Sequence, residues 1–212
     1  AYEIAGISGV ELGLSSDTAM ADHLRELHSF PYLSNSDAHS TENIAREYIA
    51  LRLAEPTFSE LRLALGSRRG RRIVANYGLD PRLGKYYRTF CPGCSAKVSL
   101  MPDRRCMECG GQVVPGVYDR LLEIATTDEA PAPGRPPYIH QVPLRFIPGL
   151  GPAGIRRLVA RFGTHMEILH RAGFDELAEI VGEKIARQIL ASRHARPVIQ
   201  DGAGGRYGRL EG

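Results

Sequence analysis

The chain has 212 residues, 43% of them hydrophobic, and a formal net charge of +3. This length accommodates one or two ordinary domains or several small modules, and the hydrophobic fraction is sufficient for packed cores. Neither a membrane span nor a signal peptide is recognisable, so we expect no membrane partner. The small net charge does not by itself indicate a nucleic-acid partner.

The cationic residues are strongly biased toward arginine. Lys85, Lys97 and Lys184 are the three lysines, so 27 − 3 = 24 of the cationic residues are arginine. Arginine suits bidentate contacts with phosphate groups. Coding by GC-rich DNA would produce the same bias, so the composition leaves both explanations open.

The first part of the chain has the pattern of a parallel α/β unit. Residues 4–10 are apolar and predict a buried strand, residues 19–28 have a helical pattern, and residues 31–34 predict a second strand. In such units active sites gather where strands end. Asp37 and His39 follow the second strand, and a spacing of two points both side chains to one side of an extended backbone. A carboxylate and an imidazole placed in this way can share a metal cluster, although the same pattern also suits a turn aspartate beside a surface histidine.

Three further elements are predicted before residue 80. Residues 44, 48 and 51 are apolar at helical spacing, so a helix is expected to begin near residue 42 after a cap at Ser40 or Thr41. Thr57 and Glu60 form a capping-box pattern that predicts a helix to about residue 65. Residues 73–76 predict a strand. The arginine cluster at residues 68–72 is either a solvated loop or a contact with DNA backbone.

The four cysteines form two C-x-x-C pairs, Cys91 with Cys94 and Cys106 with Cys109, and eleven residues separate the pairs. This spacing predicts a tetrahedral four-cysteine zinc site with no open position for substrate, and therefore a structural rather than a catalytic metal. Two disulfides or four unrelated thiols are the alternatives. Cysteines used as metal ligands indicate a reducing compartment, which we expect to be the cytoplasm.

Beyond the cysteines, the sequence predicts a helix and then an extended segment. Residues 117–125 are apolar at positions 117, 121, 122 and 125, which favours a helix that packs the cysteine module onto its neighbour. Residues 126–137 are rich in proline and predict a linker of polyproline character.

The last part of the chain contains two copies of a helix-hairpin-helix pattern. In the first, Gly149-Leu150-Gly151 predicts a tight turn at a helix N-terminus, where backbone N–H groups and the helix dipole favour a phosphate. Such a contact holds DNA backbone without reading its bases. The second copy, over residues 177–186, retains one turn glycine, Gly182. Residues 196–212 are rich in glycine and are expected to be mobile.

Taken in this order, the motifs resemble endonuclease Q, a branch of the polymerase-and-histidinol-phosphatase (PHP) family. The resemblance is carried by residues 11–17, by residues 34–40 followed by Arg46-Glu47, by the four cysteines, the proline-rich segment and the paired hairpins, and by residues 204–208. It implies an α/β fold with small modules. The expected parts are the C-terminal part of a distorted (β/α)7 barrel (1–80), a zinc-ribbon-like module (81–126), a linker (127–137), an all-α tandem hairpin domain (138–195) and a glycine-rich tail (196–212).

The resemblance also implies a function. Endonuclease Q cuts a DNA strand on the 5′ side of deaminated bases, such as deoxyuridine and hypoxanthine, and of abasic sites. Asp37 and His39 would then be catalytic ligands of divalent Zn, Mn or Mg, and Glu11, Ser15 and Ser16 would bind the substrate phosphate or the damaged nucleotide. The partner would be double-stranded DNA. The residues expected to contact it are Gly149, Leu150, Gly151, Gly154, Arg156, Gly182 and Lys184.

The chain departs from the family pattern at its start. The family opens with a His-x-His strand that this sequence lacks, so roughly the first two fifths of the family's length are expected to be missing or to lie on another chain. Two ligands cannot hold the whole cluster, and the chain alone is expected to be inactive. Tyr87 stands where a histidine is expected. The alternatives are a non-catalytic DNA-binding adaptor and a PHP phosphoesterase that acts on small phosphate esters.

Overall fold

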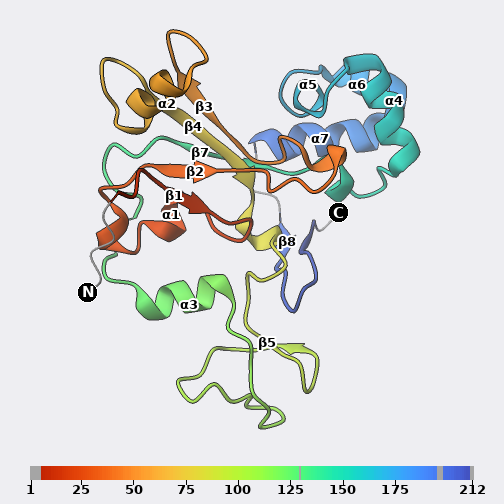
Figure 1. Cartoon of the computed structure of the whole chain (residues 1–212). Helices are drawn as coiled ribbons and strands as arrows, with labels where there is room; N and C mark the ends of the chain where they lie inside the picture. The colour runs from red at the N-terminus through yellow and green to blue at the C-terminus, as the bar shows by residue number, and fades with distance from the viewer. Residues whose placement is uncertain (1–5, 129, 195–197, 211–212) are drawn as a thin grey trace.

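The computed structural model describes residues 6–128, 130–194 and 198–210. Figure 1 shows three parts: an α/β body, a module built around the four cysteines that extends beyond α3 (Val117–Ile124), and a helical lobe on the opposite side of the body. In the described residues, no helix has the length and apolar character needed to cross a lipid bilayer.

The α/β body contains two small sheets. In the first, β1 (Val10–Leu12) runs parallel to β2 (Tyr32–Ser34), with α1 (Thr18–Ala21) and the 3-10 turn η1 (Arg25–Leu27) between them in the chain. In the second, the central strand β4 (Arg72–Leu79) pairs antiparallel with β3 (Tyr48–Arg52) and parallel with β7 (Tyr138–Gln141). The predicted parallel α/β unit is confirmed, whereas a closed barrel stays a prediction.

Three predicted elements in this body need correction. The first strand begins at Val10, so the described part of residues 6–9 is not strand, and residues 4 and 5 lie outside the described residues. The helix predicted over 19–28 is divided into α1 and η1. The helix predicted from residue 42 is a 3-10 turn, η2 (Thr41–Asn43), followed by strand β3. This segment forms a strand because its backbone pairs with that of β4 and because Tyr48 stacks on Tyr77, with ring centroids 4.5 Å apart.

The predicted helix after Thr57 is confirmed as α2 (Phe58–Leu65). The Thr57 side chain accepts from the Glu60 amide at 3.4 Å, as a capping box requires. Glu60 does not reciprocate, because its carboxylate accepts from the Ala54 amide at 2.8 Å and the Arg71 guanidinium at 2.7 Å. This ion pair holds the arginine-rich loop at residues 68–71 against the helix.

Helix α3 confirms the helix predicted over residues 117–125 and packs on the body. Leu121 forms a buried cluster with Met20 of α1 and with Tyr87, while Leu122 is 45% exposed and does not belong to the predicted apolar face. The cysteine module is joined to α3 through buried Thr89, whose amide and hydroxyl both donate to the Asp119 carboxylate at 2.7 Å.

The proline-rich segment is fixed to the body and does not behave as a free linker. Arg135 donates to both carboxylate oxygens of Asp22, at 3.1 and 2.6 Å, and the Ala132 amide donates to the same carboxylate at 2.8 Å. Asp22 also accepts from the Tyr32 hydroxyl. The segment then continues into strand β7, so residues 138–141, predicted to open the hairpin domain, belong to the sheet.

The helical lobe contains η4 (Leu144–Phe146), α4 (Pro152–Phe162), α5 (His165–His170), α6 (Phe174–Val181) and α7 (Glu183–His194). Its core includes Leu158, Ile168, Leu177 and Ile189, each fully buried. The same cluster contains Leu79 from the end of β4, so the lobe and the body share one continuous core.

The described part of the glycine-rich tail is ordered, which corrects the expected mobility. Strands β8 (Ile199–Gln200) and β9 (Arg209–Leu210) form an antiparallel hairpin that lies between the helical lobe and the cysteine module (Figure 1). The Gly202 amide donates to the Arg82 carbonyl at 2.8 Å, and a Cβ on Gly202 would lie 2.2 Å from the Gly84 oxygen. Glycine is needed here for close approach of two backbones rather than for flexibility.

Candidate metal and nucleic-acid sites

Asp37 and His39 lie together in the loop after β2, at the carboxyl edge of the parallel pair. The His39 Nε2 atom is 3.4 Å from Asp37 Oδ1, and the two side chains are 88% and 68% exposed, respectively. The two side chains lie close together, as predicted, and both are exposed. Within the described residues no third His, Cys, Asp or Glu side chain joins them, because the cysteine set is the one cluster of three or more such groups.

Arg46 holds the loop that carries this pair. Its Nε atom donates to the Ser36 carbonyl at 2.6 Å and its Nη2 atom to the Asp37 carbonyl at 3.2 Å. Asp37 has a φ of +42°, in the left-handed region that a residue with a side chain adopts at some energetic cost. The arginine therefore stabilises a strained backbone that presents the carboxylate beside His39.

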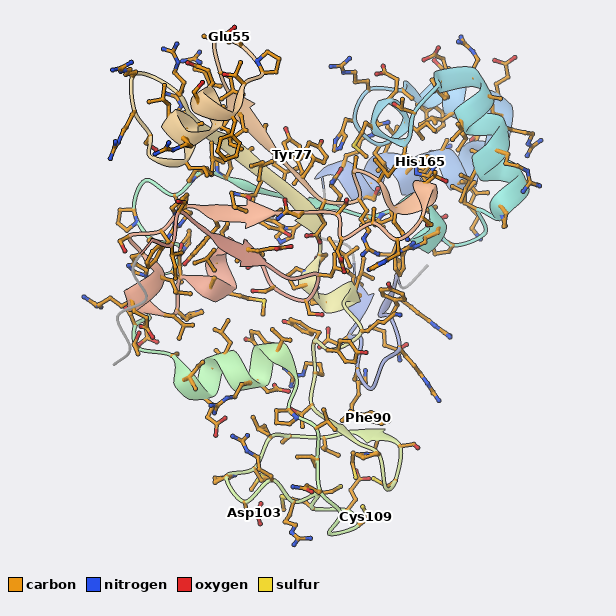
Figure 2. The ribbon with its side chains drawn as sticks, in the orientation of Figure 1. Glu55, Tyr77, Phe90, Asp103, Cys109 and His165 are labelled. Carbon is orange, nitrogen blue, oxygen red and sulfur yellow. The ribbon has the colours of Figure 1, made fainter. Side chains whose placement is uncertain are left out.

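A chain of hydrogen bonds connects Arg46 to the helical lobe. The Gln141 side-chain amide donates to the Arg46 carbonyl at 3.4 Å, and the Gln141 side-chain oxygen lies 2.7 Å from His170 Nε2. Burial, with smaller contributions from Arg193 and Arg171, lowers the pKa of His170. His170 also makes an edge-to-face contact with Tyr77, which Figure 2 labels on β4. The candidate metal loop and the helical lobe are thus held in one network.

The three residues predicted to bind substrate lie in different environments. Glu11 is exposed on β1, at the position that pairs with Leu33 of β2. Ser15 is 8% exposed and packs so closely against Gly84 that a Cβ there would lie 2.1 Å from its hydroxyl oxygen. Ser16 is half-buried, and its hydroxyl donates weakly to the Asp17 carbonyl at 3.5 Å. The structure therefore gives Ser15 a packing contact.

A buried polar cluster beneath this loop was not predicted as a site. Glu47 is 2% exposed; its Oε1 atom accepts from the Leu79 amide at 2.9 Å, and its Oε2 atom has no partner in the described residues. Burial raises the pKa of Glu47 to about 7, and the Glu11 carboxylate adds to the effect. Asn76, 1% exposed, accepts from the Ser34 hydroxyl at 3.1 Å. Glu47 directly precedes β3, Asn76 lies in β4 and Ser34 in β2, so no local sequence pattern predicts that these polar groups meet.

The four cysteine thiols converge within their module, in which Figure 2 labels Cys109. Their ligand atoms all lie within 4.8 Å of one another, with Cys91 and Cys109 sulfurs 3.5 Å apart and Cys94 and Cys106 sulfurs 3.7 Å apart. Four sulfurs at about 2.3 Å from a central zinc ion would be about 3.8 Å apart in a tetrahedron. The four thiols are free and fit one tetrahedral metal ion, so the two-disulfide alternative is not what the structure contains.

The two glycine turns of the helical lobe lie close to each other. Gly149 has a φ of +79° and lies beside Ile185, while Gly182 has a φ of +82° and separates α6 from α7. Leu150 is 5% exposed and joins the core, as its predicted role of joining two helices requires. A Cβ on Gly154 would lie 2.7 Å from Leu150, which explains that glycine.

The remaining residues predicted to contact DNA gather around these turns. Gly149, Gly151 and Gly182 are exposed, as are Arg156 and Lys184. Among the described residues, neither of these two cations makes a hydrogen bond or an ion pair. Both turns thus present backbone and at least one cation to solvent.

These features together define a class of protein: an α/β body with an exposed Asp–His pair at a strand end, a four-thiol metal module, and a helical lobe with two exposed glycine turns. Comparison with solved structures shows which proteins the chain is similar to. The lesion-specific endonuclease PfuEndoQ from Pyrococcus furiosus has a TM-score of 0.85 and 39% sequence identity, and the match covers 100% of this chain and 56% of that one. A structure of endonuclease Q in complex with a 27-mer duplex substrate that has an abasic lesion at the active site gives a TM-score of 0.86 and 38% identity, covering 100% and 57% of the two chains.

The chain therefore matches the C-terminal portion of endonuclease Q over its whole length and spans a little over half of the solved chains. It is also 44% identical over 211 residues to the uncharacterized protein YqxK of Bacillus subtilis, covering 99% of this chain and 54% of that protein. An uncharacterized protein of Methanocaldococcus jannaschii is 35% identical over 222 residues, which cover 95% of this chain and 28% of the relative. No protein-family model matches the chain.

Proposed function

We propose that this chain is part of a DNA-repair endonuclease that nicks one strand on the 5′ side of a deaminated base or an abasic site. The observation that carries the proposal is the convergence of Asp37 and His39, 3.4 Å apart and exposed, at the strand end of a body whose fold matches lesion-specific endonucleases. The chain spans a little over half of the solved endonuclease Q chains, so the activity is a property proposed for the complete protein.

The chemistry assigned to this site is metal-assisted phosphodiester hydrolysis. A bound divalent ion, Zn, Mn or Mg, would activate water and stabilise negative charge on the attacked phosphate. Asp37 offers an oxygen ligand and His39 a nitrogen ligand, and Arg46 fixes the loop that presents them. Two ligands are too few for such a site, so the hypothesis requires further ligands from outside these 212 residues.

The damaged nucleotide would be taken out of the duplex stack into a pocket, where the lesion can be recognised. Glu11 is the exposed member of the predicted substrate-binding set and lies on the strand beside β2, within electrostatic reach of Glu47. Ser16 is half-buried in the following loop. We retain Glu11 and Ser16 as candidate contacts to the substrate and assign Ser15 to packing.

The helical lobe would hold the duplex through its phosphates. The turns at Gly149–Gly151 and Gly182 present backbone N–H groups at the starts of α4 and α7, where the helix dipoles favour an anion. Lys184 lies in the first turn of α7 and Arg156 directly after the first turn of α4, and both would add charge. This is a tandem helix-hairpin-helix function, and it positions the duplex without reading its sequence.

The cysteine module would bind one structural zinc ion and contribute no chemical step, because four thiolates fill a tetrahedral shell. The ion would stabilise a module whose own core is small, with Cys91, Cys106 and Val113 as its buried members. A metal bound to the folded state alone stabilises that state directly.

Nicking of a defined duplex tests the proposal. The chain is combined, as a fusion, with the part of the Bacillus relative that it does not span, and is incubated with a fluorescent duplex containing one uracil or one abasic site and Mn²⁺. The expected product is a nick on the 5′ side of the lesion. Asp37→Asn should abolish the nick, and Glu55→Gln, which changes an exposed glutamate in the loop before α2, should not. A nick of unchanged rate with Asp37→Asn would refute the metal-ligand role.

A second function, a non-catalytic DNA-binding adaptor, is favoured by one observation: within the described residues, Asp37 and His39 gather no third metal-binding side chain. An adaptor would bind duplex DNA through its helical lobe and leave every lesion uncut. The same fusion discriminates the two functions, because tight duplex binding without a nick under any divalent metal would establish the adaptor.

A further inference from the structure

The glycine-rich tail is held in place by backbone contacts along one path on the body. The Gly202 and Gly208 amides donate to the carbonyls of Arg82 and Leu83 at 2.8 and 3.0 Å, and the Gly205 amide donates to the Lys85 carbonyl at 3.1 Å. Cβ atoms built on Gly202 and Gly208 would lie 2.2 and 2.5 Å from backbone oxygens. The tail is therefore a fixed arm, and its side chains have defined positions.

This arm forms one wall of a groove whose other wall is the first glycine turn. The groove has a volume of about 750 Å³ and is lined by residues 145–151 on one side and 206–210 on the other. Arg145, Arg206 and Arg209 contribute three guanidinium groups to the lining, and none of the described residues that line the groove is acidic. A surface with this composition is complementary to a polyanion.

The arginines of the arm are available to a ligand. Arg206 and Arg209 are exposed, and among the described residues their side chains make no hydrogen bond or ion pair. On the opposite wall, the amides of Gly149 and Gly151 donate to no protein acceptor within the described part of the chain. Donors of two kinds, guanidinium and backbone amide, thus face one groove.

Tyr207 fixes the geometry between the two walls. Lys85 lies over its ring at 4.6 Å from the centroid, and Arg145 lies over the same ring at 5.4 Å. Phe146 meets the ring edge to face, with centroids 5.4 Å apart. Cation–π contacts of this kind hold the cations in a defined arrangement without neutralising them, so the positive charge of the groove is preserved.

We infer that the tail, residues 198–210, is a second phosphate-binding element, which together with the Gly149–Gly151 turn grips the backbone of duplex DNA in this groove. The inference rests on the proposed function, because it names the part of the substrate that this surface binds. It gives a role to residues 204–208, which the sequence alone left without one. The contacts would be made to phosphates, and binding would be independent of base sequence and of the lesion.

Fluorescence anisotropy with a labelled duplex tests this inference on the chain itself, over a range of salt concentrations. Log affinity falls linearly with log salt concentration, and each phosphate contact made by a cation makes this slope steeper by about 0.9. The double variant R206A/R209A should therefore reduce the slope by about 2. The loss should be the same for a uracil-containing duplex and for its undamaged counterpart.

The matched control is R120A/R171A, which removes the same net charge from two arginines that pair with Glu123 and Glu167 away from the groove. It should leave the slope unchanged. Circular dichroism and thermal unfolding check that both variants fold, and R206Q/R209Q provides a second neutral replacement that retains side-chain length.

The outcomes separate this inference from the proposed function. If the unmodified chain binds duplex and R206A/R209A binds with the same slope, the tail has no role in binding while the proposed DNA contact stands. If the loss in R206A/R209A is matched by the control, the effect is one of net charge and the groove is not the site. If the unmodified chain binds no duplex at any salt concentration, both the groove and the proposed DNA-binding lobe are refuted.

Discussion

Glu47→Gln is expected to make the protein more stable at neutral and alkaline pH. Glu47 is 2% exposed, one of its carboxylate oxygens has no partner in the described residues, and burial raises its pKa from 4.5 to about 7. Between these two values the folded state binds a proton that the unfolded state has lost. The free energy of unfolding therefore falls as pH rises through this window, by about 1.4 kcal/mol per pH unit and about 3 kcal/mol in all.

Glutamine removes the charge while its side-chain oxygen can still accept from the Leu79 amide. Urea unfolding at pH 5 and pH 8, at constant zinc, measures the effect. The variant should be more stable than the parent by about 3 kcal/mol at pH 8 and should match it more closely at pH 5. The control is Glu55→Gln at an exposed site (Figure 2), which should change neither value appreciably. Equal stability of parent and Glu47→Gln at pH 8 would show that burial does not raise the pKa of Glu47.

The other predictions concern packing and metal. Arg135→Leu leaves the fully buried Asp22 carboxylate without its cation, and urea unfolding should show a loss of about 3–5 kcal/mol; exposed Arg52→Leu should cost less than about 0.5 kcal/mol, and a similar small loss for both would contradict the buried ion pair. Gly202→Ala places a Cβ 2.2 Å from the Gly84 oxygen, so the tail should lose protection from amide hydrogen exchange, and unchanged protection would show that the hairpin does not need this close approach. A chelator should release one equivalent of zinc, measured with a metal-sensitive dye, and amide exchange should then rise in the cysteine module while the sheet of the body keeps its protection. Release of no metal from freshly purified protein would argue against the four-cysteine site.

Sequence patterns predicted the arrangement correctly where the residues involved are close together in the chain. The spacing of the four cysteines predicted their convergence, because each pair lies in a single turn. The spacing of Asp37 and His39 predicted that their side chains would meet, although the left-handed backbone at Asp37 was not foreseen. The turn at Gly149–Gly151 was predicted from its two glycines, and the helix after it begins at Pro152.

Patterns failed where partners are distant in the chain. Residues 44, 48 and 51 have helical spacing, but β4 pairs with this segment and makes it a strand. The proline-rich segment was expected to be a linker because its anchor, the Asp22–Arg135 pair, joins residues 113 positions apart. A glycine-rich sequence is compatible both with a flexible chain and with a closely packed backbone. In the tail, backbone hydrogen bonds to residues 82–85 hold the chain in the closely packed form. Glu47 was overlooked as a titrating group because its hydrogen-bond partner, the Leu79 amide, is 32 positions away in the chain.

The tail hairpin also touches the cysteine module. The Arg88 amide, three residues before Cys91, donates to the Gly202 carbonyl at 3.0 Å, and the Lys97 ammonium donates to the Asp201 carbonyl at 3.2 Å. One segment thus borders both the candidate zinc site and the groove assigned to DNA. Linked equilibria are reciprocal, so if zinc orders this segment for DNA, a bound duplex must in turn tighten the hold on zinc. Under the proposed function, removal of zinc would then weaken the binding of duplex DNA in the groove.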